Sequence, residues 1–128
     1  MQKTMRIQKR LWVAVCAALL AASAVAVDSK QSFENRCGWF VNPTPANVSL
    51  IDRDGEWIIG IQGGHQAEGD WPRFKRNQWV EQNGSYGYGC ACLKVIVDKD
   101  THEVVQIDSA SARPLDSCRQ DPALKEPK

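Results

Sequence analysis

Two cysteines separated by a single residue constrain this chain more than any other feature. Cys90 and Cys92 lie within residues 86–97, a stretch rich in aromatic and β-branched residues that predicts an extended strand. Residues two apart on a strand point to the same side, so both thiols face one way. An extended Cys-x-Cys also holds its Cβ atoms too far apart to form a disulfide without distortion. Two other segments must therefore meet this strand, which predicts a small β domain stapled by disulfides.

The N-terminus has the pattern of an export signal. Basic residues among the first ten are followed by an apolar run over 11–27 that contains Ala24-Val25-Ala26. This pattern predicts a Sec-type signal peptide, residues 1–26, cleaved after Ala26 or, as a second choice, after Ala24. A retained membrane anchor is the alternative, although the run is short for a span and rich in alanine.

A lipoprotein is a third interpretation of the leader, because it contains Cys16. However, Val15 stands where a lipobox requires a small residue, and the apolar run continues past Cys16. We therefore expect Cys16 to be removed with the leader. The expected product is a periplasmic or secreted protein with one domain, residues 27–128, whose ordered core spans about 36–118.

The mature chain is weakly acidic. Residues 27–128 hold all fifteen acidic residues and twelve of the sixteen basic ones, a net charge of −3. This balance lacks the basic footprint that nucleic-acid binding requires. The mature sequence has no second apolar run long enough to span a membrane, so we expect no membrane partner after cleavage. A chain of about a hundred residues is expected to form one domain with one modest core. We expect a monomer.

Four cysteines remain after cleavage, and an even count in a small exported domain predicts two disulfides. A metal or redox site on Cys-Ala-Cys is the alternative, but zinc sites usually space their cysteines more widely, so we expect neither metal nor cofactor. A strand returning from the turn at Lys99-Asp100 would bring the following chain to the Cys90 side. This favours Cys90–Cys118 and Cys37–Cys92. The reverse assignment stays open, because the ten residues before Cys118 can span about 30 Å.

The remaining pattern is that of an all-β protein without a helix. A turn at 53–55 joins two strands as a hairpin, whereas the prolines of 42–47 and the small residues of 109–114 predict turns. Residues 62–70 are polar and rich in glycine, which predicts a long loop. We expect a small antiparallel barrel or rolled sheet of about five strands. Those strands are 36–41, 48–52, 56–61, 86–97 and 103–107.

Several motifs together carry a resemblance. They are Cys37-Gly38-Trp39-Phe40, Asn42-Pro43-Thr44-Pro45, Asp52-Arg53-Asp54-Gly55-Glu56-Trp57, Gln62-Gly63-Gly64 and Tyr86-Gly87-Tyr88-Gly89-Cys90-Ala91-Cys92. With these motifs the chain resembles the family named domain of unknown function 4087, over nearly the whole mature sequence. The resemblance implies a bacterial, exported, envelope-facing protein. It implies no activity, ligand or catalytic residue.

The glycine-rich loop is the first candidate site. Gly63 and Gly64 would let backbone amides approach a ligand, and His65 could act with Glu68 or Asp70 as acid and base. The simpler interpretation is a tight turn beside a solvated histidine, because no third catalytic partner is evident.

Tryptophan provides the second candidate. Trp39 and Trp57 lie in apolar strands and are expected in the core. Trp71 and Trp79 flank polar and basic sequence, so an exposed aromatic platform for a sugar or a partner protein competes there with a place in the core.

These observations favour a non-enzymatic binding or inhibitor module of the cell envelope, whose partner is an envelope protein or a glycan. One alternative is a small hydrolase using His65 with Glu68 or Asp70. Another is a structural envelope protein with no ligand.

Overall fold

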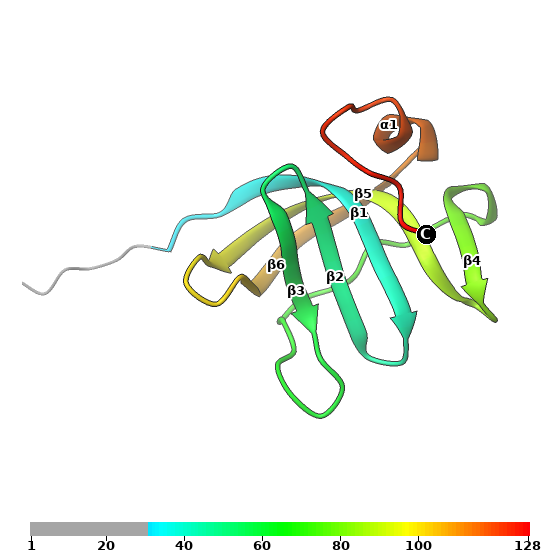
Figure 1. The fold of residues 1–128 in the computed structure, drawn as a ribbon. Helices are drawn as coiled ribbons and strands as arrows, with labels where there is room; N and C mark the ends of the chain where they lie inside the picture. Colours follow the sequence, from blue (N-terminus) through cyan, green and yellow to red (C-terminus); the bar gives the residue numbers. More distant parts are fainter. Residues whose placement is uncertain (1–30) are drawn as a thin grey trace, which may run out of the picture.

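The computed structural model describes residues 31–128, so the predicted signal peptide and its cleavage site lie outside the described residues. Six strands, one 3-10 turn and one short helix follow each other along the chain (Figure 1). The elements are β1 Glu34–Thr44, β2 Asn47–Asp52, β3 Gly55–Gly60, η1 Arg76–Gln78, β4 Trp79–Asn83, β5 Tyr86–Asp98, β6 Glu103–Arg113 and α1 Leu115–Arg119.

The strands form one sheet in the order β1-β2-β3-β6-β5-β4, and β1 also pairs with β5. The first five of these strands therefore close into a ring, and β4 continues from β5 to form a free edge. All pairings are antiparallel except that of β3 with β6, which consists of the single parallel pair Ile58 and Glu103. The predicted all-β fold is confirmed in its rolled form, with a ring that stops short of a true barrel.

Three local predictions differ from the structure. β1 continues through Pro43, which is possible because its pairing with β5 ends at Asn42 and its pairing with β2 shifts after Val41. β6 continues to Arg113, since the small residues predicted to turn pair with β5 instead. β4 was not predicted, so the sheet has six strands rather than about five. The short helix α1 was not predicted either.

The inside of the ring is the main core. Alternate residues of β5 point inward, and Ala91, Leu93 and Val95 are all buried there. They pack with apolar residues from every other strand of the ring: Phe40, Val48, Leu50, Trp57, Ile59, Val104 and Ile107.

A second, smaller core lies on the outer face of β5. Trp39, Tyr88 and Cys90 are buried beneath α1, which contributes Cys118. The C-terminal segment adds Leu124 to this cluster, and Figure 1 shows that segment passing beside α1. Strand β1 thus begins at Glu34, and packing against this outer core extends to Leu124.

Both disulfides attach to this outer face and join the predicted cysteines. Cys37–Cys92 links β1 and β5 at positions that face each other directly, and Cys90–Cys118 ties α1 to β5. Two disulfides indicate an oxidising compartment. Among the described residues, helices are too short and too polar to cross a membrane.

Candidate functional site

One row of residues across three strands begins the site. Phe40 of β1, Gly89 of β5 and Trp79 of β4 stand opposite one another in register. Because Gly89 has no side chain, the row is open at its centre, and the ring of Phe74 fills the opening: a Cβ built on Gly89 would lie 2.5 Å from Phe74 Cε1. The chain before β4 thus folds across the end of the ring.

Four aromatic rings are linked by this arrangement. Phe74 lies 4.9 Å from Trp79 and 5.6 Å from Phe40, and Phe40 lies 6.0 Å from Trp71, measured between ring centroids. Phe40 is buried in the main core, whereas Trp71 is 38 % exposed. The core therefore supports a partly exposed aromatic surface through direct ring contacts.

This surface is the wall of a hollow of about 420 Å³, here called the aromatic groove. Its apolar residues are joined by the polar side chains of Lys75, Arg76, Glu81 and Ser85. Backbone and side-chain bonds fix the rim, since Trp79 Nε1 donates to the Ser85 carbonyl at 3.0 Å and Lys75 N donates to Gln78 Oε1 at 3.0 Å. The groove thus combines flat apolar faces with charged groups, as small-molecule sites commonly do.

The glycine-rich loop has a different position. Residues 62–70, here called the seam loop, run along the gap between β3 and β6, where the ring closes through one pair only. Ala67 N donates to the Ile59 carbonyl at 2.8 Å, and Glu68 N donates to the Val105 carbonyl at 3.1 Å. The Glu68 carbonyl accepts from Ile107 N at 2.7 Å. These backbone groups complete the ring.

His65 also contacts the seam. Its Nε2 lies 2.7 Å from the Val104 carbonyl oxygen, and its Nδ1 lies 3.8 Å from Glu103 Oε2. The side chains of Glu68 and Asp70 are exposed, and His65 is paired with neither. The structure therefore brings Trp71 and Trp79 together in one groove, whereas His65 and Glu68 lie at the seam. Gly63 and Gly64 belong to the exposed turn that precedes them, in which Gly64 N donates to the Ile61 carbonyl.

A stack around Trp57 was not anticipated from the sequence. The Arg36 guanidinium lies 3.8 Å from the Trp57 ring centroid, and the His102 ring stacks on Trp57 at 4.6 Å. Asp52 accepts from Arg36 at 2.7 Å and from Trp57 Nε1 at 3.1 Å. Burial opposes the charge on Arg36, but its hydrogen bonds with Asp52, Glu34 and Asp54 outweigh burial and raise its pKa. Trp57 and Trp39 are core residues, as predicted.

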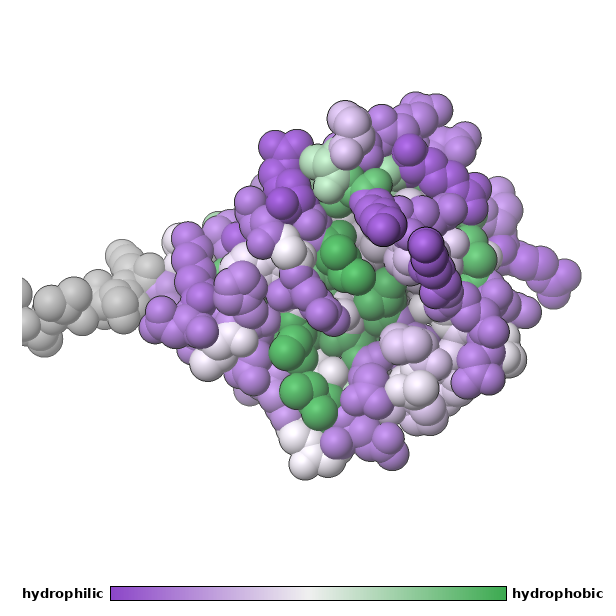
Figure 2. Space-filling view, in the orientation of Figure 1, coloured by the Kyte–Doolittle hydropathy of each residue, from purple (hydrophilic) through white to green (hydrophobic). Residues whose placement is uncertain are grey.

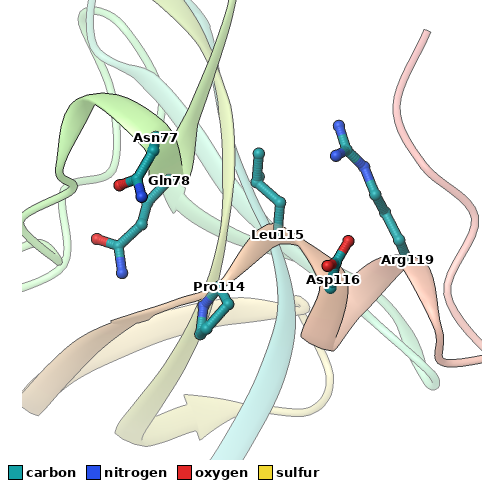
Figure 3. A pocket seen from close by; sticks show the side chains of 6 residues that line it. All are labelled: Asn77, Gln78, Pro114, Leu115, Asp116 and Arg119. Atoms are coloured by element: carbon teal, nitrogen blue, oxygen red, sulfur yellow. The ribbon is translucent and has the colours of Figure 1, made fainter.

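Two further hollows are less suited to a ligand. Figure 3 shows side chains of η1 and α1 around a polar hollow of about 300 Å³, in which Arg119 is already paired with Glu126. Figure 2 shows apolar side chains gathered over the middle of the face formed by β1, β2 and β3. A hollow of about 240 Å³ there is lined by Val41, Ile58 and Ile61 among others, and its volume lies below the usual range of ligand pockets.

Residues 31–125 match the model of a family described as "Protein of unknown function (DUF4087)". The chain belongs to this family. The resemblance predicted from the motifs is thereby confirmed. Neither the curated proteins nor the solved structures gave a significant match.

The DUF4087 region includes both the aromatic groove and the seam loop, so family membership does not show which of them is the site. The geometry of the two regions favours the aromatic groove. The seam loop uses its backbone to complete the sheet, and the described residues contain no group of three potential metal ligands. The aromatic groove has the exposed ring of Trp71 and exposed charged side chains that take no part in closing the sheet, and it is the candidate site of this DUF4087 protein.

Proposed function

We propose that this protein is an exported, non-enzymatic binding module of the cell envelope, and that it holds a glycan in the aromatic groove. One observation carries the proposal: four linked rings connect the buried core to the exposed face of Trp71. A sugar ring has apolar C–H faces and polar hydroxyl edges. Aromatic faces beside Glu81, Ser85 and Lys75 offer partners to both.

Binding rather than hydrolysis is supported by the position of His65. A hydrolase would use His65 with Glu68 or Asp70, yet the His65 ring atoms are directed at Glu103 and at the Val104 carbonyl. Export is supported by the signal-peptide pattern of residues 1–26 and by two disulfides.

The test uses the full chain, expressed with its own leader in a bacterial host and recovered from the periplasmic extract. Export predicts an intact mass that begins at Val27. Binding to an oligosaccharide panel is then followed by tryptophan fluorescence and calorimetry. Trp71→Ala should weaken binding by about fivefold to tenfold, since loss of one stacked ring is worth about 1–1.5 kcal/mol.

Phe33→Ala is the matched control, because Phe33 is 39 % exposed, close to the 38 % of Trp71, and lies outside the groove. It should leave affinity unchanged. If no oligosaccharide binds, or if both variants weaken binding equally, the groove is not the glycan site and the proposal is wrong.

A further inference from the structure

Three basic residues gather beside the aromatic groove. Arg73, Lys75 and Arg76 lie between Trp71 and Trp79 in the sequence, with no acidic residue among them, although residues 27–128 carry a net charge of −3. All three side chains are exposed. Among the described residues none of the three forms a salt bridge, whereas Arg36, Lys94 and Arg119 each pair with a carboxylate. The groove therefore has positive charge available for a ligand.

A second hollow lies beside Trp79. This hollow of about 520 Å³ is lined by Arg76, Trp79 and Glu81, which also line the aromatic groove of about 420 Å³. The two hollows thus share these three side chains, one hollow on each side of Trp79 being our interpretation. Each one alone is large enough for a small ligand. Together they suit a chain that crosses Trp79 and continues on both sides.

The position of Glu81 limits which class of extended ligand can bind in the two hollows. Its carboxylate lines both hollows, where it can accept hydrogen bonds from hydroxyl groups. An acidic peptide would place carboxylates beside Glu81 without bringing hydroxyl donors. A nucleic acid would approach a domain of net negative charge. A polysaccharide that carries both hydroxyls and carboxylates can satisfy Glu81 and the basic residues together.

From this arrangement we infer that the ligand is an extended, carboxylate-bearing polysaccharide lying across Trp79. Lys75 and Arg76 determine specificity by binding its carboxylates, and Arg73 adds to the local positive charge. Glu81 accepts sugar hydroxyls. The inference rests on the proposed function and specifies the ligand class of the same groove.

The test compares two probes of equal length: a hexamer of a uronic acid, and the neutral hexamer made by reducing its carboxylates to alcohols. The periplasmically recovered protein should bind the acidic hexamer at least tenfold more tightly. Lys75→Gln with Arg76→Gln should abolish that preference. The control, Lys99→Gln with Lys125→Gln, removes equal charge at exposed positions that do not line either hollow and should retain it. Raising the salt concentration should reduce the preference.

The outcomes separate the two proposals. Equal binding of both hexamers, still lost in Trp71→Ala, would overturn the carboxylate assignment and leave the glycan-binding function standing. A disaccharide that binds as tightly as the hexamer would overturn the extended ligand. Tighter binding of a glutamate hexapeptide would overturn the choice of a polysaccharide. Failure of the wild-type protein to bind any saccharide would overturn both proposals.

Discussion

Replacing Gly69 by alanine should open the ring at its weakest point. Gly69 has a φ of +105°, and a Cβ there would collide with the Ile107 carbonyl oxygen. A left-handed backbone costs a non-glycine residue about 1–2 kcal/mol. Moving the loop away from β6 would also strain the two backbone bonds between Glu68 and β6, each worth about 1 kcal/mol. The expected loss is about 3–4 kcal/mol of the free energy of unfolding.

Urea denaturation measures this loss. With m near 2 kcal/mol/M, the midpoint should fall by about 2 M while m stays constant. Gly64→Ala is the matched control, because its Cβ would meet Ile61 at an ordinary distance of 3.6 Å, and stability should stay within about 1 kcal/mol of wild type. A Gly69→Ala midpoint equal to that of wild type, or an equal fall in Gly64→Ala, would refute the role assigned to the seam.

Three further predictions concern stability. Changing Cys37 and Cys92 together to alanine should cost about 4 kcal/mol in urea denaturation, because the disulfide closes a loop of sequence separation 55; a cost under about 1 kcal/mol would contradict this. Asp52→Ala should cost about 3 kcal/mol, since it removes a buried partner of Arg36, and a neutral effect would show that Glu34 and Asp54 suffice. Burial and the nearby Glu126 raise the pKa of Tyr88 above its ordinary value of 10.0, although Arg119 opposes this, so the folded state keeps that proton longer than the unfolded state. Wild-type stability should therefore fall more steeply above about pH 10 than that of Tyr88→Phe, and parallel curves would contradict it.

The parts of the fold that the sequence predicted are those with local signals. A run rich in aromatic and β-branched residues marks β5, and the turn at 53–55 marks the β2–β3 hairpin. β6 beyond Ile107 had no such signal, because its residues are small and polar. It is a strand since β5 offers an unpaired edge there, which is a property of the tertiary structure.

The candidate site was predictable to a similar degree. Trp71 and Trp79 were identified because bulky aromatics in polar, basic sequence are conspicuous. Phe40 and Phe74, which connect them, were missed, since only strand register places Phe40 beside the chain that precedes β4. The role of the seam loop in closing the ring depends on contacts with β3 and β6, which are distant from each other in the sequence. The sequence alone showed only a polar loop rich in glycine, which is also the pattern of a ligand-binding loop.

The paired cysteines of β5 also affect how the chain reaches its final alignment. The run Tyr-Gly-Tyr-Gly-Cys-Ala-Cys repeats every two residues, so β1 could slip by two positions and still keep its inward side chains inward. In that slipped state Phe40 would again face a glycine, and Cys37 would face Cys90 instead of Cys92. A disulfide formed between Cys37 and Cys90 in that state would hold β1 and β5 in the wrong register. Cys118 would then lack its native partner, Cys90. Hydrophobic burial alone does not distinguish the two registers. We therefore expect thiol–disulfide exchange to convert the Cys37–Cys90 pairing into the native Cys37–Cys92 pairing.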